Sequence, residues 1–307
     1  MKFKWEGVMP AMTTKFTADD SLDLPAFKHN LRAQLNAGVH GVILGGSLGE
    51  ASTLSQDELQ LLLRETVAEV GDSIPVISTI ATGSTRNALL FARQARDCGA
   101  SGLMVLPPMR YKATEREILQ FFESIAKETD LPVMIYNNPV DYQIGVSISM
   151  FETLLKYDNI QAVKESTRDI SNITRIKNEF GDRLKILCGV DTLALESLLM
   201  GADGWVAGLV CAFPAETVAI YELVRAGRTT EALELYRWFL PLLELDINPQ
   251  LVQNIKLAEV ATGLGTEHVR LPRLPLSGEE RIRVERIIKK AMANKPELPD
   301  YKKYLQS

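Results

Sequence analysis

The sequence predicts a closed barrel of eight parallel strands alternating with helices, the (β/α)8 or TIM-barrel fold, followed by a C-terminal three-helix extension. Apolar runs of strand length recur at intervals of about 25 to 30 residues, and a helix-sized segment follows each run. The runs are apolar along their whole length, as expected of strands covered on both faces. Together these units occupy residues 1–226, close to the usual barrel size of about 250 residues. An open doubly wound sheet is the alternative, but we find neither its edge strands nor its switch point.

Each expected strand is followed by an expected helix in chain order. The strands are expected at residues 7–14, 41–44, 75–80, 102–106, 131–136, 160–164, 184–188 and 204–209. The helices are expected at residues 23–38, from 55 onward, and at 85–98, 115–129, 149–157, 170–180, 192–200 and 215–226. Ser55 is the expected N-cap of the second helix, and Glu58 completes a capping box. Residues 229–245, 252–262 and 277–293 add three helices, so we divide the chain into a barrel (1–226) and a helical extension (227–307) packed on it.

The composition narrows the class of protein. The chain has 307 residues, 46% of them hydrophobic, and a formal net charge of −5. Mixed charges without a basic patch argue against nucleic acid or a membrane surface as partner. No apolar run approaches the roughly 20 residues that span a bilayer, and residues 1–7 lack the apolar core of a signal peptide, so we expect a cytoplasmic protein. With three widely spaced cysteines and three histidines, we expect neither a disulfide framework nor a metal site.

Lys164 is the sharpest candidate for chemistry. It closes the apolar run of the sixth expected strand, and a barrel carries its active site where the strands end. An ammonium at such a place loses hydration, which lowers its pKa, and a neutral amine can attack a carbonyl or imine carbon. The alternative is a structural lysine paired with Glu165 or another carboxylate.

Tyr136 closes the fifth expected strand, one strand–helix unit before Lys164. Neighbouring parallel strands end at the same edge of a sheet, so the phenol and the amine are expected to lie together. A phenol both donates and accepts hydrogen bonds, so Tyr136 is a candidate to carry protons to and from the atom that Lys164 attacks. The alternative is an aromatic ring packed at the barrel rim.

The loop after the second expected strand, Gly45-Gly46-Ser47-Leu48-Gly49-Glu50, is rich in backbone amides. Its three glycines, Gly46 among them, let an anion approach closely. The loop lacks the Gly-Lys-Ser/Thr of a Walker motif, and its spacing fails the dinucleotide fingerprint. A substrate carboxylate is therefore the expected ligand.

Further strand-end residues complete the expected substrate-binding set, namely Arg110, Gly189, Asp191 and Val206. Arg110 either binds a second anionic group or lies in solvent. Asp191 precedes the helix expected from Thr192, where a carboxylate is a good N-cap, so we favour capping over substrate contact. Glu50 and Glu165 are expected to be buried hydrogen-bond acceptors that fix loops.

Together these residues resemble the dihydrodipicolinate synthase / N-acetylneuraminate lyase superfamily, along essentially the whole chain. The motifs are the Gly-Ser-x-Gly-Glu loop at 46–50, the Tyr-Asn-x-Pro turn at 136–139 and the Lys-Glu-Ser strand end at 164–166. The resemblance implies that Lys164 forms a Schiff base with a 2-oxo acid and that Tyr136 relays protons. It implies that Ser47 and the Leu48 amide hold the substrate carboxylate. It also implies a homotetramer built from dimers, with no metal and no organic cofactor.

Departures from the family pattern narrow the expected substrate. Residues 140–142 offer no arginine for the second carboxylate that lysine-biosynthesis synthases bind. Leu48 stands where most members have a hydroxyl residue. Met109-Arg110-Tyr111 replaces a tyrosine pair, which puts the usual interface proton relay in doubt. Residues 107–112, 136–139 and 211–214 are similar to the 1-pyrroline-4-hydroxy-2-carboxylate deaminases of hydroxyproline breakdown.

The expected reaction begins when Lys164 attacks C2 of the cyclic imine. Loss of the 4-hydroxyl and hydrolysis then give 2-oxoglutarate semialdehyde and ammonia. A 2-oxo-3-deoxy sugar-acid dehydratase and a pyruvate-releasing aldolase share the same iminium, so both stay open. A ligand-binding barrel without catalysis and a phosphate-binding barrel enzyme are rivals from other classes. The Lys164–Tyr136 pair argues against the first, and the second leaves Lys164 without a role.

Overall fold

The computed structural model describes residues 3–108 and 111–305, and its core is a parallel sheet. The eight strands are β1 (Gly7–Pro10), β2 (Val42–Leu44), β3 (Val76–Ile80), β4 (Gly102–Val105), β5 (Val133–Asn137), β6 (Ile160–Glu165), β7 (Lys185–Cys188) and β8 (Gly204–Ala207). Their order in the sheet is β1-β8-β7-β6-β5-β4-β3-β2. Consecutive strands are therefore neighbours throughout, which is the order of a barrel.

The barrel closes between β1 and β2. Just beyond β1, Ala11 pairs with Ile43 of β2 in a parallel bridge, and the Met12 amide donates to the Ile43 carbonyl at 2.9 Å. Because β1 also pairs with β8, it has a neighbour on each side. The predicted (β/α)8 barrel is confirmed, and the open doubly wound alternative is excluded.

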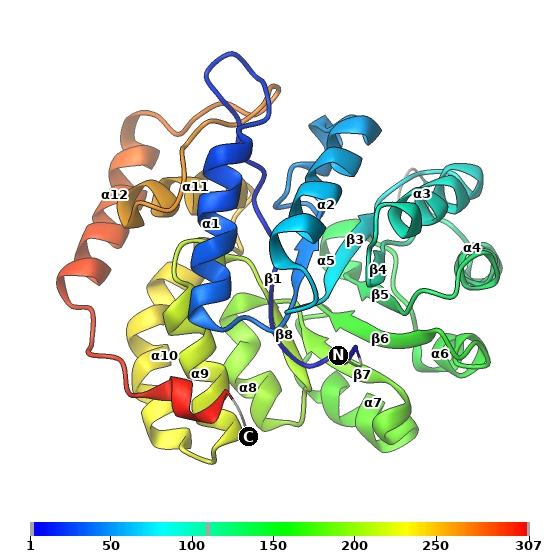
Figure 1. The fold of residues 1–307 in the computed structure, drawn as a ribbon. Helices are drawn as coiled ribbons and strands as arrows, with labels where there is room; N and C mark the ends of the chain where they lie inside the picture. The colour runs from blue at the N-terminus through cyan, green and yellow to red at the C-terminus, as the bar shows by residue number, and fades with distance from the viewer. Residues whose placement is uncertain (1–2, 109–110, 306–307) are drawn as a thin grey trace.

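Helices surround the barrel as an outer ring, and α9 to α12 gather on the side of α1 (Figure 1). They are α1 (Leu24–Ala37), α2 (Gln56–Val70), α3 (Thr85–Asp97), α4 (Glu115–Glu128), α5 (Pro139–Tyr142), α6 (Ile148–Leu154), α7 (Ser171–Phe180), α8 (Ala194–Leu199), α9 (Pro214–Arg225), α10 (Thr229–Leu243), α11 (Leu251–Thr262) and α12 (Gly278–Ala293). Short 3-10 turns lie at Ala51–Thr53, Gly181–Arg183, Asp191–Leu193, Leu209–Cys211 and Tyr301–Tyr304.

Local sequence explains where several helices begin. Ser55 caps α2, and the reciprocal bond from Glu58 completes the predicted capping box. Thr114 and Glu117 form a second capping box at the start of α4. Each box satisfies backbone amides that the first helical turn leaves without partners.

Two differences from the prediction lie near the ends of the strands. Strand β1 ends at Pro10 rather than at residue 14, because the next hydroxyl residues bond elsewhere: Thr13 Oγ1 donates to Glu259 at 2.5 Å, and Thr14 Oγ1 donates to the Gly49 carbonyl at 2.7 Å. The helix predicted at 149–157 is α6, and a short helix that was not predicted, α5, precedes it. The Asn138 side chain caps α5, and Pro139 opens it, a combination favourable for a helix start.

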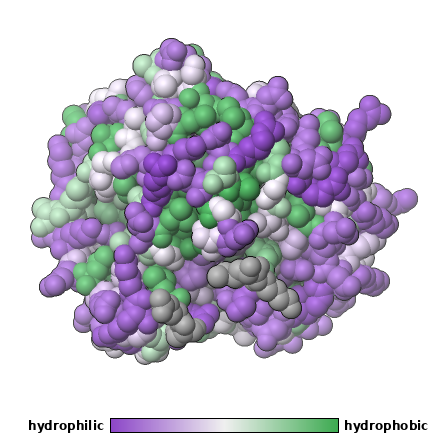
Figure 2. Space-filling model, in the orientation of Figure 1, coloured by the Kyte–Doolittle hydropathy of each residue, from purple (hydrophilic) through white to green (hydrophobic). Residues whose placement is uncertain are grey.

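The helices after residue 226 pack against the barrel. Asn30 Nδ2 of α1 donates to the Leu264 carbonyl beyond α11 at 2.9 Å, and the Tyr301 hydroxyl donates to the Ala37 carbonyl at 3.1 Å. On the face in Figure 2, hydrophilic residues cover most of the surface and hydrophobic ones form separate patches. Among the described residues, we find no helix long and apolar enough to cross a membrane.

Candidate active site

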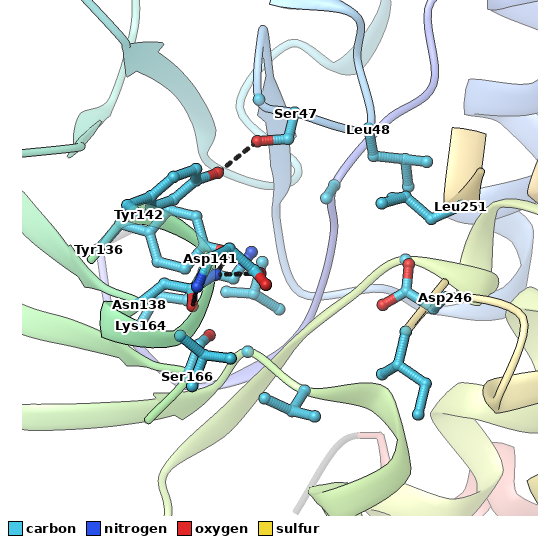
Figure 3. A pocket seen from close by; sticks show the side chains of 18 of the residues that line it. Ser47, Leu48, Tyr136, Asn138, Asp141, Tyr142, Lys164, Ser166, Asp246 and Leu251 are labelled. Carbon is cyan, nitrogen blue, oxygen red and sulfur yellow. Dashed lines mark hydrogen bonds between the residues drawn. The ribbon is translucent and has the colours of Figure 1, made fainter. Parts of the chain in front are cut away.

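Strands β5 and β6 bring Tyr136 and Lys164 together. The two residues are register partners, and the Lys164 Nζ atom lies 4.1 Å from the centre of the Tyr136 ring. Both line a cavity of about 660 Å³ at the carboxyl ends of the strands. Figure 3 shows them on one wall of this cavity, with Asp246 and Leu251 on the other. The arrangement predicted from the two strand ends is therefore present.

The Lys164 amine is buried without a carboxylate partner. Lys164 is 8% exposed, and within residues 3–108 and 111–305 its Nζ atom makes no hydrogen bond or salt bridge. The neighbouring Glu165 carboxylate instead accepts from the Thr167 amide at 2.9 Å and from Asn137 Nδ2 at 3.3 Å. Burial lowers the pKa of Lys164, and the nearby Tyr142 and Asp246 side chains only partly oppose that shift. The structural-lysine alternative therefore fails, and a neutral nucleophile fits the site.

Gly189 lets the Lys164 side chain fold over the end of β7. A Cβ atom at this position would lie 2.6 Å from Lys164 Cε and would also collide with Ser166 Oγ. Only glycine leaves room for the lysine stem in this conformation. Gly189 also lines the cavity, so the same residue keeps space for Ser166 Oγ and for the lysine stem.

Tyr136 is oriented by its own turn. Asn138 Nδ2 donates to the Tyr136 hydroxyl oxygen at 3.1 Å and to Asp141 Oδ2 at 2.7 Å. Because the phenol accepts this bond, its proton is free to point into the cavity. Burial raises the pKa of Tyr136 to about 12, so the phenol holds its proton at neutral pH.

A second tyrosine, which the sequence analysis did not single out, completes this wall. The Tyr142 hydroxyl lies 2.6 Å from Ser47 Oγ, and its ring meets that of Tyr136 edge to face at 5.6 Å between centres. Helix α5 carries Tyr142 to this place. The Asn-Pro pair that starts α5 was the signal in the sequence that could have found it. The two tyrosines and Ser47 form a cluster of hydroxyl groups above Lys164 (Figure 3).

The glycine-rich loop presents free backbone amides to the same cavity. Gly46, Ser47 and Leu48 line it, and among the described residues nothing accepts from the Ser47 and Leu48 amides. The loop is held by Glu50, whose carboxylate accepts from Lys256 Nζ at 2.5 Å and from the Arg270 amide at 3.2 Å. Fixed, unpaired amides of this kind suit a carboxylate group.

Asp191 does not cap a helix, so the favoured interpretation of this residue was wrong. Its carboxylate accepts from Trp205 Nε1 at 2.9 Å and from the Leu209 amide at 2.9 Å, with longer bonds from the Gly208 amide. Asp191 is buried beneath the cavity and is not among the residues that line it. Trp205 on β8 and the backbone amides just after β8 bind the Asp191 carboxylate, so it is not available to cap the helix that follows in the sequence.

The other predicted substrate-binding residues divide into two groups. Val206 lines the cavity from β8. Arg110 lies outside the residues that the structure describes. Another arginine, Arg168, stands at the cavity mouth with a left-handed backbone (φ 62°), and its guanidinium lies 3.5 Å from Asp141 Oδ1.

The helical extension contributes one wall of the cavity, which the sequence analysis missed. The residues that line it from this side are Asp246, Ile247, Asn248, Pro249 and Leu251. They lie at the start of α11 and in the loop before it, far along the chain from the strand ends. Within the described residues, we find no cluster of His, Cys, Asp and Glu side chains that could hold a metal ion.

Comparison with known proteins shows to which family this barrel belongs. The model of the dihydrodipicolinate synthetase family matches residues 4–291. The chain belongs to this family. It is 31% identical to the 4-hydroxy-tetrahydrodipicolinate synthase of Exiguobacterium sibiricum over 275 residues, which cover 89% of this chain and 92% of the relative. It is also 31% identical to the synthase of that name from Xanthomonas campestris pv. campestris over 293 residues, 94% of this chain and 95% of the relative.

Solved structures of the family superpose closely. The 4-hydroxy-tetrahydrodipicolinate synthase of Methylacidiphilum fumariolicum SolV matches with a TM-score of 0.89 at 26% identity, covering 95% of this chain and 98% of that one. A prophage protein of the family from E. coli K12, solved in complex with pyruvate, matches with a TM-score of 0.88 at 25% identity, covering 94% and 99%. Members of this family are lyases of the lysine Schiff-base type, related in chemistry to class I aldolases, so the chain is an enzyme of that type.

Proposed function

We propose that this lyase is a 1-pyrroline-4-hydroxy-2-carboxylate deaminase and that Lys164 is its Schiff-base residue. One observation carries the proposal: the Lys164 amine is buried in the cavity, has no carboxylate partner among the described residues, and lies against the Tyr136 ring. Burial lowers the pKa of Lys164, which favours the neutral amine that acts as the nucleophile.

The substrate is held by its carboxylate. The free Ser47 and Leu48 amides receive that group, which places C2 of the imine next to Lys164 Nζ. Addition of Nζ to C2 and departure of the ring nitrogen open the ring and leave a primary amine on C5. The protein-bound iminium draws electrons from C3, so the C3 proton becomes acidic. Tyr136 and the Ser47–Tyr142 pair then carry protons on this wall of the site.

Loss of the 4-hydroxyl follows from the enamine. The resulting unsaturated iminium shifts its double bond toward C5, and water hydrolyses the two imine bonds. The products are free Lys164, ammonia and 2-oxoglutarate semialdehyde. The reaction consumes two waters and releases one, and no step changes the overall oxidation state.

The walls of the cavity favour a small cyclic substrate. Leu48, Val140, Val206 and Leu251 present aliphatic side chains to it. A long polyhydroxy chain would leave hydroxyl groups against these residues without hydrogen bonds, which is costly. Arg168 already faces Asp141, so its charge is partly compensated.

A 4-hydroxy-tetrahydrodipicolinate synthase is the second candidate, supported by the names of the relatives. It would use the same lysine with pyruvate, as the pyruvate complex of the E. coli family member suggests for the head group. Residues 140–142 after the Tyr-Asn-x-Pro turn supply no arginine for a second carboxylate. The dehydratase and aldolase reactions stay as further alternatives that begin with the same iminium.

Product analysis tests the proposal. The purified protein is incubated with 1-pyrroline-4-hydroxy-2-carboxylate, with pyruvate plus aspartate semialdehyde, and with a 2-oxo-3-deoxy sugar acid. We expect ammonia and 2-oxoglutarate semialdehyde from the first mixture alone. Borohydride added during turnover should attach mass to the peptide that contains Lys164, and the matched variant Lys156→Ala, which removes an exposed lysine, should trap as well as wild type. Pyruvate formed from the sugar acid, with no ammonia from the imine, would reject the deaminase and keep the Schiff-base lysine.

A further inference from the structure

Asp246 places a carboxyl group in the cavity on the wall opposite the tyrosines. It lies in the loop between α10 and α11 and lines the cavity, and Figure 3 shows its carboxyl group directed into the space that Lys164 and Tyr136 face. The loop is anchored on both sides: the Asp246 amide donates to the Leu243 carbonyl at 3.0 Å, and buried Asn254 donates to the Leu245 carbonyl at 3.1 Å. The carboxyl group is therefore held at this wall by the backbone.

The chain just after β8 leaves room for the Asp246 carboxyl group. A Cβ atom on Gly208 would collide with Asp246 Oδ1, so a glycine is needed where the carboxyl group meets the chain just after β8. Across the described residues, no donor hydrogen-bonds to the Asp246 carboxyl oxygens. A polar group that lacks a partner inside a cavity is costly unless a ligand completes it.

The surroundings of Asp246 favour its protonated form. Burial, assisted by Asp191 beneath the cavity and Asp141 from α5, raises the pKa of the Asp246 carboxyl well above its ordinary value, and Lys164 of β6 opposes the shift. The pKa of Lys164 is itself lowered by burial. Both shifts favour the uncharged forms, an amine on one side of the cavity and a carboxylic acid on the other.

We propose that Asp246 is the general acid that protonates the 4-hydroxyl group as it leaves, a role that rests on the proposed deaminase function. The carboxylate cradle and Lys164 fix C1 and C2 of the substrate near β2 and β6. The far end of the substrate, with C4 and its hydroxyl, then extends toward the loop that carries Asp246. The tyrosine cluster lies on the other wall, so it serves C2 and C3.

The step is balanced in protons and electrons. The enamine nitrogen of Lys164 pushes its electron pair to re-form the C2 iminium, and the former C2–C3 electrons become the C3–C4 double bond. The C4–O bond breaks, its electron pair leaves with the oxygen, and the proton from Asp246 completes a water molecule. Asp246 is left as a carboxylate, which can accept the proton later lost from C5. Nothing is oxidised or reduced.

Asp246→Asn separates this step from imine formation. The amide keeps the shape of the side chain but cannot supply the proton. We expect ammonia release from the 4-hydroxy imine to fall by roughly 10²- to 10⁴-fold, the usual contribution of a general acid. Borohydride trapping at Lys164 should continue, and enzyme-catalysed exchange of the C3 protons of 1-pyrroline-2-carboxylate into deuterium oxide should stay within about twofold of wild type. That substrate lacks the leaving group, so its exchange needs Lys164 but not Asp246.

The matched control is Glu244→Gln, which removes an exposed carboxylate two residues earlier, beside the end of α10. We expect its ammonia release to equal that of wild type. Asp246→Asn with ammonia release within fivefold of wild type would overturn the role of Asp246 and leave the deaminase proposal standing. Loss of trapping and exchange together with turnover would also overturn it, because Asp246 would then shape the whole site. Failure of wild type to release ammonia from the imine would overturn both proposals.

Discussion

The barrel mouth contains two buried lysines over aromatic rings, and they differ in what else they touch. Lys164 Nζ lies 4.1 Å from the centre of the Tyr136 ring, and Lys256 Nζ lies 4.8 Å from the centre of the Phe16 ring. Lys256 also donates to Glu50 at 2.5 Å and to the His268 carbonyl at 2.6 Å. Within the described residues, Lys164 has no such acceptor. Both lysines are thus buried, but only Lys256 is paired with a carboxylate.

This difference in pairing predicts different roles for the two amines. An amine that is hydrogen-bonded to a carboxylate and a carbonyl is occupied, and the bonds fix the loop that follows β2. An amine that faces a cavity without an acceptor is destabilised as a cation and open to attack an electrophile. Tyr136 has a phenol where Phe16 has a phenyl ring, which adds a proton donor beside the proposed nucleophile. The comparison predicts that Lys164 serves activity and Lys256 serves stability.

Lys164→Met should produce the largest effect on activity and little effect on stability. Removal of the nucleophile should lower kcat/KM by roughly 10⁴-fold or more. The methionine keeps the aliphatic stem and removes a buried amine without a partner, so the free energy of unfolding should be unchanged or higher. Initial rates of ammonia release and urea unfolding measure the two quantities. Residual activity within tenfold of wild type would show that the Schiff base forms elsewhere.

Lys256→Met should show the reverse. It removes the closest cation from the fully buried Glu50 carboxylate and leaves only Arg273 at 3.8 Å, which should lower the free energy of unfolding by about 3 to 5 kcal/mol. The double variant Lys256→Met/Glu50→Gln removes the stranded charge and should recover much of that loss. Urea titration of the three proteins gives the coupling between the two residues. If the single variant proves as stable as wild type, the ion pair does not hold the loop.

The strand ends were the part of the site that the sequence could predict. Whole-length apolar runs gave the eight strands, and the parallel pairing of β5 with β6 then placed Tyr136 beside Lys164. Burial at the end of such a run also predicted the direction in which the Lys164 pKa shifts, and the structure confirms it. These inferences depend on local patterns and on one rule of sheet geometry.

The rest depended on contacts between distant segments. Local preference favoured Asp191 as a helix cap, but Trp205 and the amides after β8 compete for its carboxylate. Asp246 belongs to a loop between two helices of the extension, and no pattern in the sequence connects that loop with the strand ends. The position of Tyr142 depends on a short helix that the prediction overlooked. Each of these residues acquires its surroundings only when the barrel closes.

The role of Lys256 in stability also predicts how the free energy of unfolding depends on pH. Burial lowers the pKa of Lys256 to about 8, against an ordinary value of 10.5, and Glu50 opposes that shift. Between these values the unfolded chain binds a proton at this site that the folded chain does not, so stability rises with pH. The contribution is complete above pH 10.5 and lost as the pH falls through 8. It amounts to about 3 kcal/mol.

Subtracting the Lys256→Met profile from that of wild type isolates this contribution from those of the other titratable groups. Urea unfolding at several pH values between 7 and 11 supplies both profiles. A flat difference across this window would mean that Lys256 stays charged in the folded protein and that its pairing with Glu50 outweighs the burial.

Tyr142→Phe should give the smallest effect on activity. It tests whether the hydroxyl cluster, like Lys164, serves activity rather than stability. The variant removes the 2.6 Å contact with Ser47 Oγ but keeps the edge-to-face packing on Tyr136. We expect kcat to fall about tenfold, the value of one hydrogen bond of about 1.4 kcal/mol, with the free energy of unfolding unchanged. Tyr157→Phe, a tyrosine outside the cavity, is the control and should match wild type in both measurements. An unchanged kcat in Tyr142→Phe would limit proton transfer on this wall to Tyr136, whereas a loss confined to KM would mean that the Ser47–Tyr142 pair only binds the substrate.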